Sequence, residues 1–194
     1  MARTKAFDES EALARAMGLF WEHGYEATSV RELAAWTGLS SSSLYATFGD
    51  KHDVYLAALD RYRAAELEEV RNVLSAPRPV RETLRAMFAD LINSLMADKG
   101  QRGSFTLNAA VELASRDVEV AARLRAHFDD IRKLLAARLS TAQANGEIST
   151  SHAPGELAHY LLFGLYSLAT MVKVYPDRAS LERTAVLTLA VLDC

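Results

Sequence analysis

The chain has 194 residues, of which half are hydrophobic and 24% are charged, so it is long enough to bury a sizeable core and its composition excludes a disordered chain. Its one cysteine, Cys194, excludes an internal disulfide and favours a reduced, cytoplasmic setting. The net charge of −3 excludes binding to nucleic acid through bulk positive charge, so any such binding depends on where the cations are placed.

Helical periodicity dominates the chain and no segment alternates convincingly as a strand does, so we predict an all-α fold. Proline and glycine separate the segments that follow the helical period. In chain order, the expected helical segments are 8–22, 28–51, 50–74, 80–96, 104–114, 117–145, 155–175 and 179–192. The weakly charged run 157–172 is too short to span a bilayer comfortably and the N-terminus is not that of a signal peptide, so we expect no membrane association.

The segment 28–51 has the signals of two short helices joined by a tight turn. Ser29 followed by Glu32 predicts a capping box at the start of the first helix. Gly38 stands where that helix must stop and turn. The segment therefore predicts a helix-turn-helix.

The second helix of this pair has little to bury. Leu44 and Phe48, four residues apart, are its inward residues, and the others are small or hydroxylated apart from Tyr45. Core formation does not explain such a helix, whereas an outer face that enters a DNA groove does. A flexible serine linker is the alternative for 40–43, but an apolar pair follows the serines at once.

The pattern resembles the TetR family of one-component bacterial transcriptional regulators. The residues that carry the resemblance are Leu19-Phe20, Gly24-Tyr25, Thr28-Ser29-Val30, Leu33-Ala34, Gly38-Leu39-Ser40 and 44–51. It implies a homodimer, an inverted-repeat operator in double-stranded DNA, and a small molecule that releases the repressor. The helices up to residue 53 are short and those after it are long, so we expect a helix-turn-helix DNA-binding domain at 1–53. A helical ligand-binding and dimerisation bundle is expected at 54–194.

We expect a set of residues on and beside the two short helices to contact DNA. Tyr45 would place its hydroxyl at a phosphate and Lys51 its cation at the backbone, although a core tyrosine and a solvated lysine are the alternatives. The outward face has no Arg, Asn or Gln, so base reading would rely on hydroxyls, thymine methyl groups and DNA shape. The candidates are Thr28, Ser29, Ser40, Ser41, Ser42, Ser43, Tyr45, Ala46, Thr47 and Lys51.

A second set of residues is expected to line an effector pocket between the bundle helices. The candidates are Phe88, Ile92, Phe105, Asn108, Tyr166 and Met171. They favour an apolar or aromatic molecule with a polar handle. Sequence alone does not separate a pocket from a core of the same residue types, and Asn108 is at least as well explained as a buried amide bonded to backbone. Arg102-Gly103-Ser104-Phe105 resembles a motif of one subgroup that often carries cysteine where this chain has Ser104.

Surplus apolar surface predicts a two-fold dimer. We expect it to form through the segments 121–142 and 157–172, with Gly164 allowing two helices to approach closely.

No catalytic, metal or cofactor site stands out. The spacing of Glu156 and His159 is that of a di-iron helix, but such a site needs a second pair that the chain lacks. No nucleophile is placed beside a base and no glycine-rich phosphate loop exists, so we expect neither an enzyme nor a cofactor. The alternative function is a helical carrier of hydrophobic ligands, or a helical enzyme, without DNA binding.

Overall fold

The computed structural model describes residues 8–98 and 102–193, and every regular element in these ranges is helical. The all-α prediction is therefore confirmed. The helices are α1 (Glu9–His23), α2 (Val30–Thr37), α3 (Ser41–Phe48), α4 (Lys51–Leu74), α5 (Val80–Ala97), α6 (Phe105–Leu113), α7 (Val118–Ala144), α8 (Pro154–Met171) and α9 (Arg178–Leu189), followed by a short 3₁₀ turn, Ala190–Asp193.

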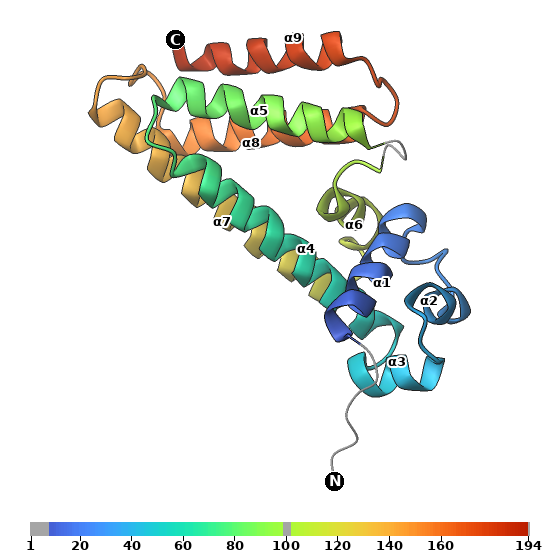
Figure 1. Cartoon of the computed structure of the whole chain (residues 1–194). Helices are drawn as coiled ribbons and strands as arrows, with labels where there is room; N and C mark the ends of the chain where they lie inside the picture. The colour runs from blue at the N-terminus through green and yellow to red at the C-terminus, as the bar shows by residue number, and fades with distance from the viewer. Residues whose placement is uncertain (1–7, 99–101, 194) are drawn as a thin grey trace.

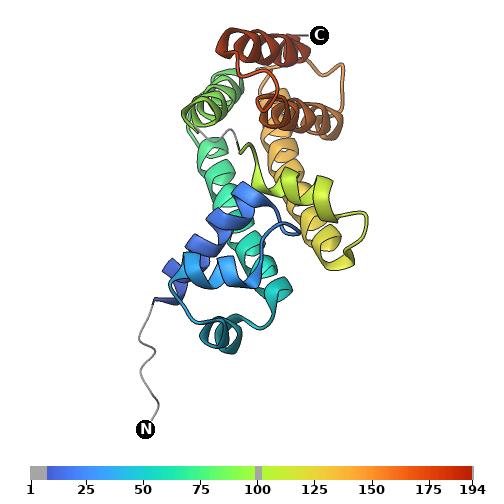
Figure 2. The same cartoon turned by 90° about the vertical axis from the view of Figure 1, so that its right-hand side faces the viewer.

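Two long helices, α4 and α7, run side by side and form the spine of the molecule (Figure 1). The short helices α1, α2 and α3 gather around the start of α4, while α5, α8 and α9 are stacked at the other end. Helix α6 lies between the two groups, against α4 and α7 (Figure 2). A movement of α4, α6 or α7 would therefore reach both ends of the molecule.

The buried apolar side chains form two clusters that share α4 and α7. The first is rich in aromatic rings: Tyr55 of α4 lies edge-on to Phe20 of α1 at 5.0 Å and to Phe105 of α6 at 5.6 Å between centroids. The second is mostly aliphatic and surrounds Phe88 and Ile92 of α5. Because Phe105 and the start of α7 belong to the first cluster, the core beneath α1–α3 continues directly into the bundle.

The apolar face of α7 is used inside the chain. Ile131 and Leu135 are fully buried in the second cluster, and α7 packs along α8. Gly164 of α8 faces α9, because a Cβ atom there would lie 2.6 Å from Thr188 Cγ2. The expectation that Gly164 lies between two copies is therefore wrong, whereas a dimer contact through α7 stays a prediction. Periodicity correctly identified their apolar faces, but the partners of those faces lie in the same chain.

Large apolar side chains remain uncovered on α8 and α9. They include Tyr160 and Phe163 of α8, 51% and 61% exposed, and Val186 and Leu187 of α9, 69% and 72% exposed. None of the helices in the described ranges is both long enough and apolar enough to cross a lipid bilayer.

Candidate nucleic-acid interface and internal cavity

The N-terminus of α2 is closed by the predicted capping box. The Ser29 amide donates to Glu32 Oε2 at 2.7 Å, and the Glu32 amide donates to Ser29 Oγ at 3.2 Å. Gly38 ends the helix with a φ of 74°, a left-handed conformation that favours glycine. Thr28 is buried and its hydroxyl donates to the Gly24 carbonyl at 2.6 Å. Of the two hydroxyls expected at this helix end, Ser29 is the exposed one.

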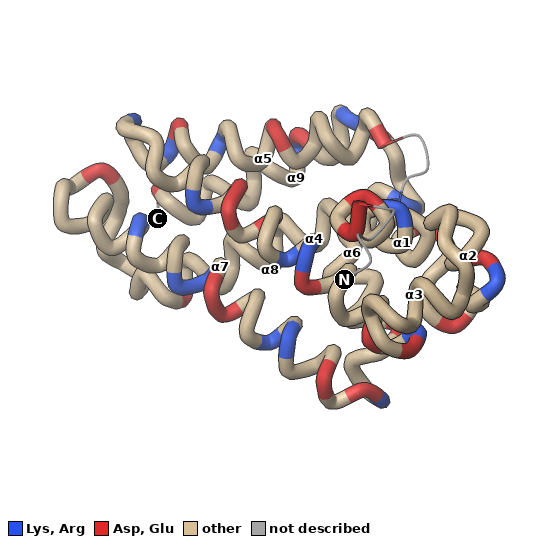
Figure 3. The backbone as a smooth tube through the Cα atoms, turned by 60° about the horizontal axis from the view of Figure 1, so that its bottom comes forward, with Lys and Arg blue, Asp and Glu red and all other residues tan. Residues whose placement is uncertain are grey.

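Helix α3 is anchored by Leu44, the residue it buries completely. Ser40 caps the helix by accepting the Ser43 amide at 3.1 Å, and its hydroxyl also meets that of Ser42 at 3.0 Å. Thr47 donates its hydroxyl to the Ser43 carbonyl at 2.9 Å. Ser41, Ser42 and Ala46 are exposed. The helix has no charged residue, and its tube is tan in Figure 3. The structure thus presents a neutral face of small and hydroxylated side chains.

Two predicted phosphate contacts flank this face. Tyr45 is half-buried against the first core cluster, and its hydroxyl makes no hydrogen bond within the described part of the chain. Lys51, the first residue of α4, holds its Nζ 4.3 Å from the centroid of the Tyr25 ring. Sequence reasoning passed over Arg31, which is exposed on the first turn of α2 and has no ion-pair partner among the described residues. Its signal in the sequence was a cation two residues after the capping serine, in the first turn of the helix.

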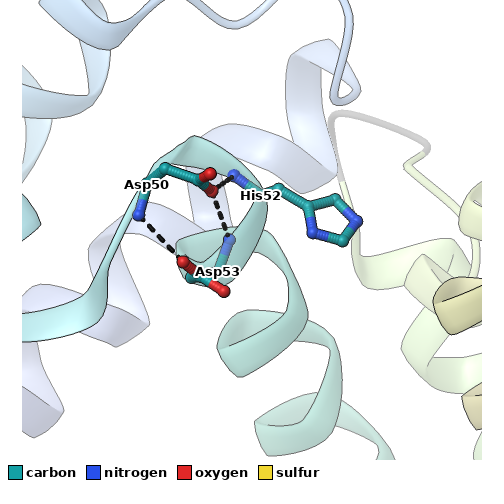
Figure 4. Close-up of side chains that lie close together, drawn as sticks. All are labelled: Asp50, His52 and Asp53. Carbon is teal, nitrogen blue, oxygen red and sulfur yellow. Dashed lines mark hydrogen bonds between the residues drawn. The ribbon is translucent and has the colours of Figure 1, made fainter.

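Asp50, His52 and Asp53 bring acidic and imidazole groups together where α4 begins (Figure 4). Asp50 Oδ1 accepts the amides of His52 at 2.8 Å and Asp53 at 3.0 Å, and the Asp50 amide donates to Asp53 Oδ2 at 3.0 Å. The His52 ring points away from both carboxylates, and its Nε2 lies 2.7 Å from Asp117 Oδ2. Helix capping and one hydrogen bond between His52 and Asp117 therefore account for this group.

The segment where α6 ends and α7 begins makes hydrogen bonds to the helix-turn-helix region and to the start of α4. Glu112 in the last turn of α6 accepts the backbone amides of Tyr25 at 3.0 Å and Glu26 at 2.9 Å. Asp117 caps α7 while it pairs with His52 of α4. The turn between α1 and α2 and the start of α4 are thus both tied to this segment.

A cavity of about 290 Å³ lies where α4, α5, α7 and α8 meet the ends of α1 and α6. Aliphatic side chains of these helices form much of its wall. Its aromatic lining residues are Trp21, Tyr62 and Tyr166, and its charged lining residues in the described part of the chain are Glu66, Glu69 and Asp90. This volume is close to the lower end of the range, about 300–1,000 Å³, in which small-molecule sites fall.

Several polar groups in the cavity wall bear on what it can bind. Tyr166 Oη and Trp21 Nε1 are buried without a hydrogen-bond partner among the described residues. Burial raises the pKa of Tyr166, and the nearby Glu66 raises it further, so the phenol stays protonated. Glu66 Oε2 meets the Thr106 hydroxyl at 3.2 Å and His127 Nε2 at 2.8 Å, so this carboxylate joins α4 to α6 and α7. The cavity therefore offers unused donors beside an anchored carboxylate.

Of the residues expected to line a pocket, Tyr166 lies in the wall of this cavity. Phe88 and Ile92 are fully buried in the second core cluster. Phe105 packs against Trp21 and Tyr62, with centroids 6.3 and 5.7 Å apart. Phe88, Ile92 and Phe105 therefore belong to the core and do not line the cavity.

Asn108 and Met171 are placed elsewhere. The Asn108 amide donates to the Arg102 carbonyl at 3.0 Å and accepts from Lys173 Nζ at 2.5 Å, as a satisfied amide does. Met171 is exposed and borders a separate groove with Val174. The six residues are therefore not brought together into one site.

Comparisons with known proteins define the class of molecule. Residues 12–58 match the family described as "Bacterial regulatory proteins, tetR family", and residues 80–187 match "Tetracyclin repressor-like, C-terminal domain". The chain is 31% identical to the transcriptional regulator YezE of Bacillus subtilis strain 168, over 100% of both chains. It is 34% identical to the transcriptional repressor ComR of Escherichia coli K12, over 93% of this chain and 85% of ComR.

The fold is also similar to that of a solved relative. A cysteine-substituted mutant of the TetR family regulator CifR, complexed with 26-base-pair double-strand operator DNA, has a TM-score of 0.86 and 29% identity, over 98% of this chain and 100% of that chain. The chain belongs to the TetR family of bacterial transcriptional regulators. The members found here are regulators, and transcriptional regulators are not enzymes.

Proposed function

We propose that this chain represses transcription in the cytoplasm as a homodimer on a palindromic operator, from which a small apolar or aromatic effector releases it. Residues 1–53 would bind DNA, and residues 54–194 would bind the effector and the second copy. The observation that carries the proposal is the likeness, over 98% of the chain, to CifR in complex with operator DNA. The neutral, uncovered face of α3 is consistent with a recognition helix in a major groove.

The proposed DNA contacts divide into positioning and reading. Ser29, Tyr45 and Lys51 would position the protein on phosphates, and we add Arg31 because it is an exposed cation without a partner among the described residues. Thr28 would act through its backbone, because its side chain is buried. Base reading would come from the outward face of α3, by Ser40, Ser41, Ser42, Ser43, Ala46 and Thr47.

A second copy would cover the apolar face of α8 and α9. Exposed side chains of this size form a patch that a monomer rarely leaves in water. Tyr160 and Phe163 of α8 lie in a helix that packs against α9, which exposes Val186 and Leu187. An interface here would leave α2 and α3, at the other end of the molecule, free for DNA (Figure 1).

The test of DNA binding is a mobility-shift titration with the DNA upstream of the chain's own gene, at two salt concentrations. We expect binding in the low micromolar range or tighter that weakens with salt, because counterions are released from phosphates. Arg31→Ala should weaken binding and lower the salt slope by about one unit. Lys133→Ala is the matched control, because it removes an equal charge from an exposed side chain on α7. Absence of binding at both salt concentrations would contradict the proposal and favour a ligand carrier.

The test of the dimer is sedimentation at micromolar concentration. Leu187→Glu places a charge in the proposed interface and should yield a monomer. Val111→Glu is the control, because Val111 is 84% exposed on α6 and is not part of the proposed interface. A wild-type monomer, or equal dissociation of both variants, would contradict the proposed interface.

A further inference from the structure

The charged side chains that line the cavity all carry the same sign. Glu66, Glu69 and Asp90 are acidic, and no Lys, Arg or His in the described ranges lines the space. Glu69 and Asp90 lie at the exposed side, whereas Glu66 is half-buried. A carboxylate or phosphate ligand would have to approach these groups where water is partly excluded and like charges repel strongly. The wall therefore disfavours anions and attracts cations.

Glu66 is built to receive a hydrogen-bond donor. Its Oε2 is fixed by Thr106 and His127, and its side chain is 21% exposed. Its Oε1 has no hydrogen-bond partner within the described ranges. A carboxylate with one anchored and one open oxygen is a preorganised acceptor for an ammonium group, and such charge-assisted bonds are the stronger kind.

The aromatic walls suit the same ligand. Trp21, Tyr62 and Tyr166 present π-systems, whose faces attract cations. The Trp21 ring already has a guanidinium against it, since Arg102 Cζ lies 4.4 Å from the centroid. That cation is outside the lining and is paired with Asp98. Lys173, a second cation near the cavity, is also outside the lining and bonds to Asn108.

We infer that the cavity binds a cationic amphiphile, a molecule with an apolar or aromatic body and a protonated amine, and that Glu66 receives the amine. That this ligand acts as the effector of a repressor rests on the proposed function. Glu66 of α4 contacts Thr106 of α6 and His127 of α7, and Glu112 at the other end of α6 binds the α1–α2 turn. An amine bound to Glu66 would therefore act on α6, which contacts the helix-turn-helix. The assigned ligand chemistry is thus narrower than "apolar or aromatic".

The test uses three probes that share one body and differ in charge: 4-phenylbutylamine, 4-phenylbutanol and 4-phenylbutyrate, at pH 7. Trp21 lines the cavity and reports binding by its fluorescence. All measurements use the Trp36→Phe variant, because Trp36, which is 50% exposed on α2, would otherwise add to the fluorescence signal. We expect the amine to bind about tenfold more tightly than the alcohol, the difference between a charge-assisted and a neutral hydrogen bond, and the carboxylate to bind most weakly.

Glu66→Gln should remove the advantage of the amine and leave the affinity for the alcohol unchanged, which also shows that the cavity is intact. Glu82→Gln on α5, outside the cavity lining, is the charge-matched control and should change neither affinity. Tightest binding by the carboxylate, no binding by any probe, or equal loss for amine and alcohol in Glu66→Gln would overturn the inference. The wild-type ranking remains a test if Glu66→Gln fails to fold. Operator binding is measured separately, so failure of the repressor proposal leaves the ranking of the probes interpretable.

Discussion

Glu112 offers the sharpest test of how the bundle holds the helix-turn-helix. Glu112→Ala removes two hydrogen bonds from the backbone amides of Tyr25 and Glu26 to one carboxylate. A buried hydrogen bond to a charged group contributes about 1.5–3 kcal/mol to stability. Because this turn is half-buried to exposed, water replaces part of the lost bonding, so we expect the free energy of unfolding to fall by about 1–2 kcal/mol in total. In a chain of this length that lowers the Tm by about 2–8 °C.

The assay is hydrogen exchange followed by mass spectrometry, together with thermal unfolding. Exchange should accelerate in peptides that cover residues 24–29, and remain unchanged in α8. Glu112→Gln keeps one acceptor oxygen and should show a smaller effect, while Glu119→Ala, an exposed acid on α7, serves as the control. Unchanged exchange at residues 24–29 in Glu112→Ala would refute the idea that α6 holds this turn.

Two further predictions concern stability. Gly164→Ala should cost about 1–3 kcal/mol by overpacking, because its Cβ would lie 2.6 Å from Thr188 Cγ2. Denaturant titration should show recovery in the double variant with Thr188→Ala, and a single variant as stable as wild type would contradict the close approach. Burial raises the pKa of Asp117, but hydrogen bonds from the Val120 amide and His52 outweigh it and hold that pKa below its usual value. Ionised Asp117 therefore stabilises the fold above about pH 4, and this contribution is lost as pH falls through the lowered folded pKa. The stability gap between wild type and Asp117→Asn should be constant near neutral pH and shrink below about pH 4; a gap independent of pH would contradict it.

Local features of the fold could be predicted because neighbouring residues determine them. The capping box of Ser29 and Glu32 was expected and is present. The helix breaks follow less closely: Pro79 stands at the N-cap position of α5, whereas α8 ends at Met171, four residues before the expected Tyr175, and a turn at 172–174 leads to Pro176. These signals act over a few residues, so they do not depend on how the chain folds back on itself.

The partners of the apolar faces could not be predicted in the same way. Phe105 was expected at the pocket, but the first turn of α6 places its ring against those of Trp21 and Tyr62. Gly164 was expected between two copies, but it faces Thr188 of the same chain. Periodicity shows which face of a helix is apolar, whereas the element that covers it depends on tertiary packing.

The candidate sites show the same limit. Thr28 and Ser29 were both expected to offer a hydroxyl to DNA, but Thr28 is buried, with its hydroxyl bonded to the Gly24 carbonyl, and Ser29 is exposed. Glu66 carried no motif, because its role depends on Thr106, His127 and the cavity, which come from distant parts of the chain. Such residues are found only once the helices are placed.

The central claim is that this chain binds DNA as a two-fold dimer through α3, and a hydroxyl-radical footprint on the DNA upstream of its own gene tests it most directly. We predict two protected stretches of inverted-repeat sequence whose centres are about 10–10.5 base pairs apart, or a multiple of that, because two recognition helices must enter grooves on one face of the duplex. Replacing Thr47 by Val should change the preferred base pairs within both stretches equally. The absence of protection, or a single protected stretch without two-fold symmetry, would contradict the claim.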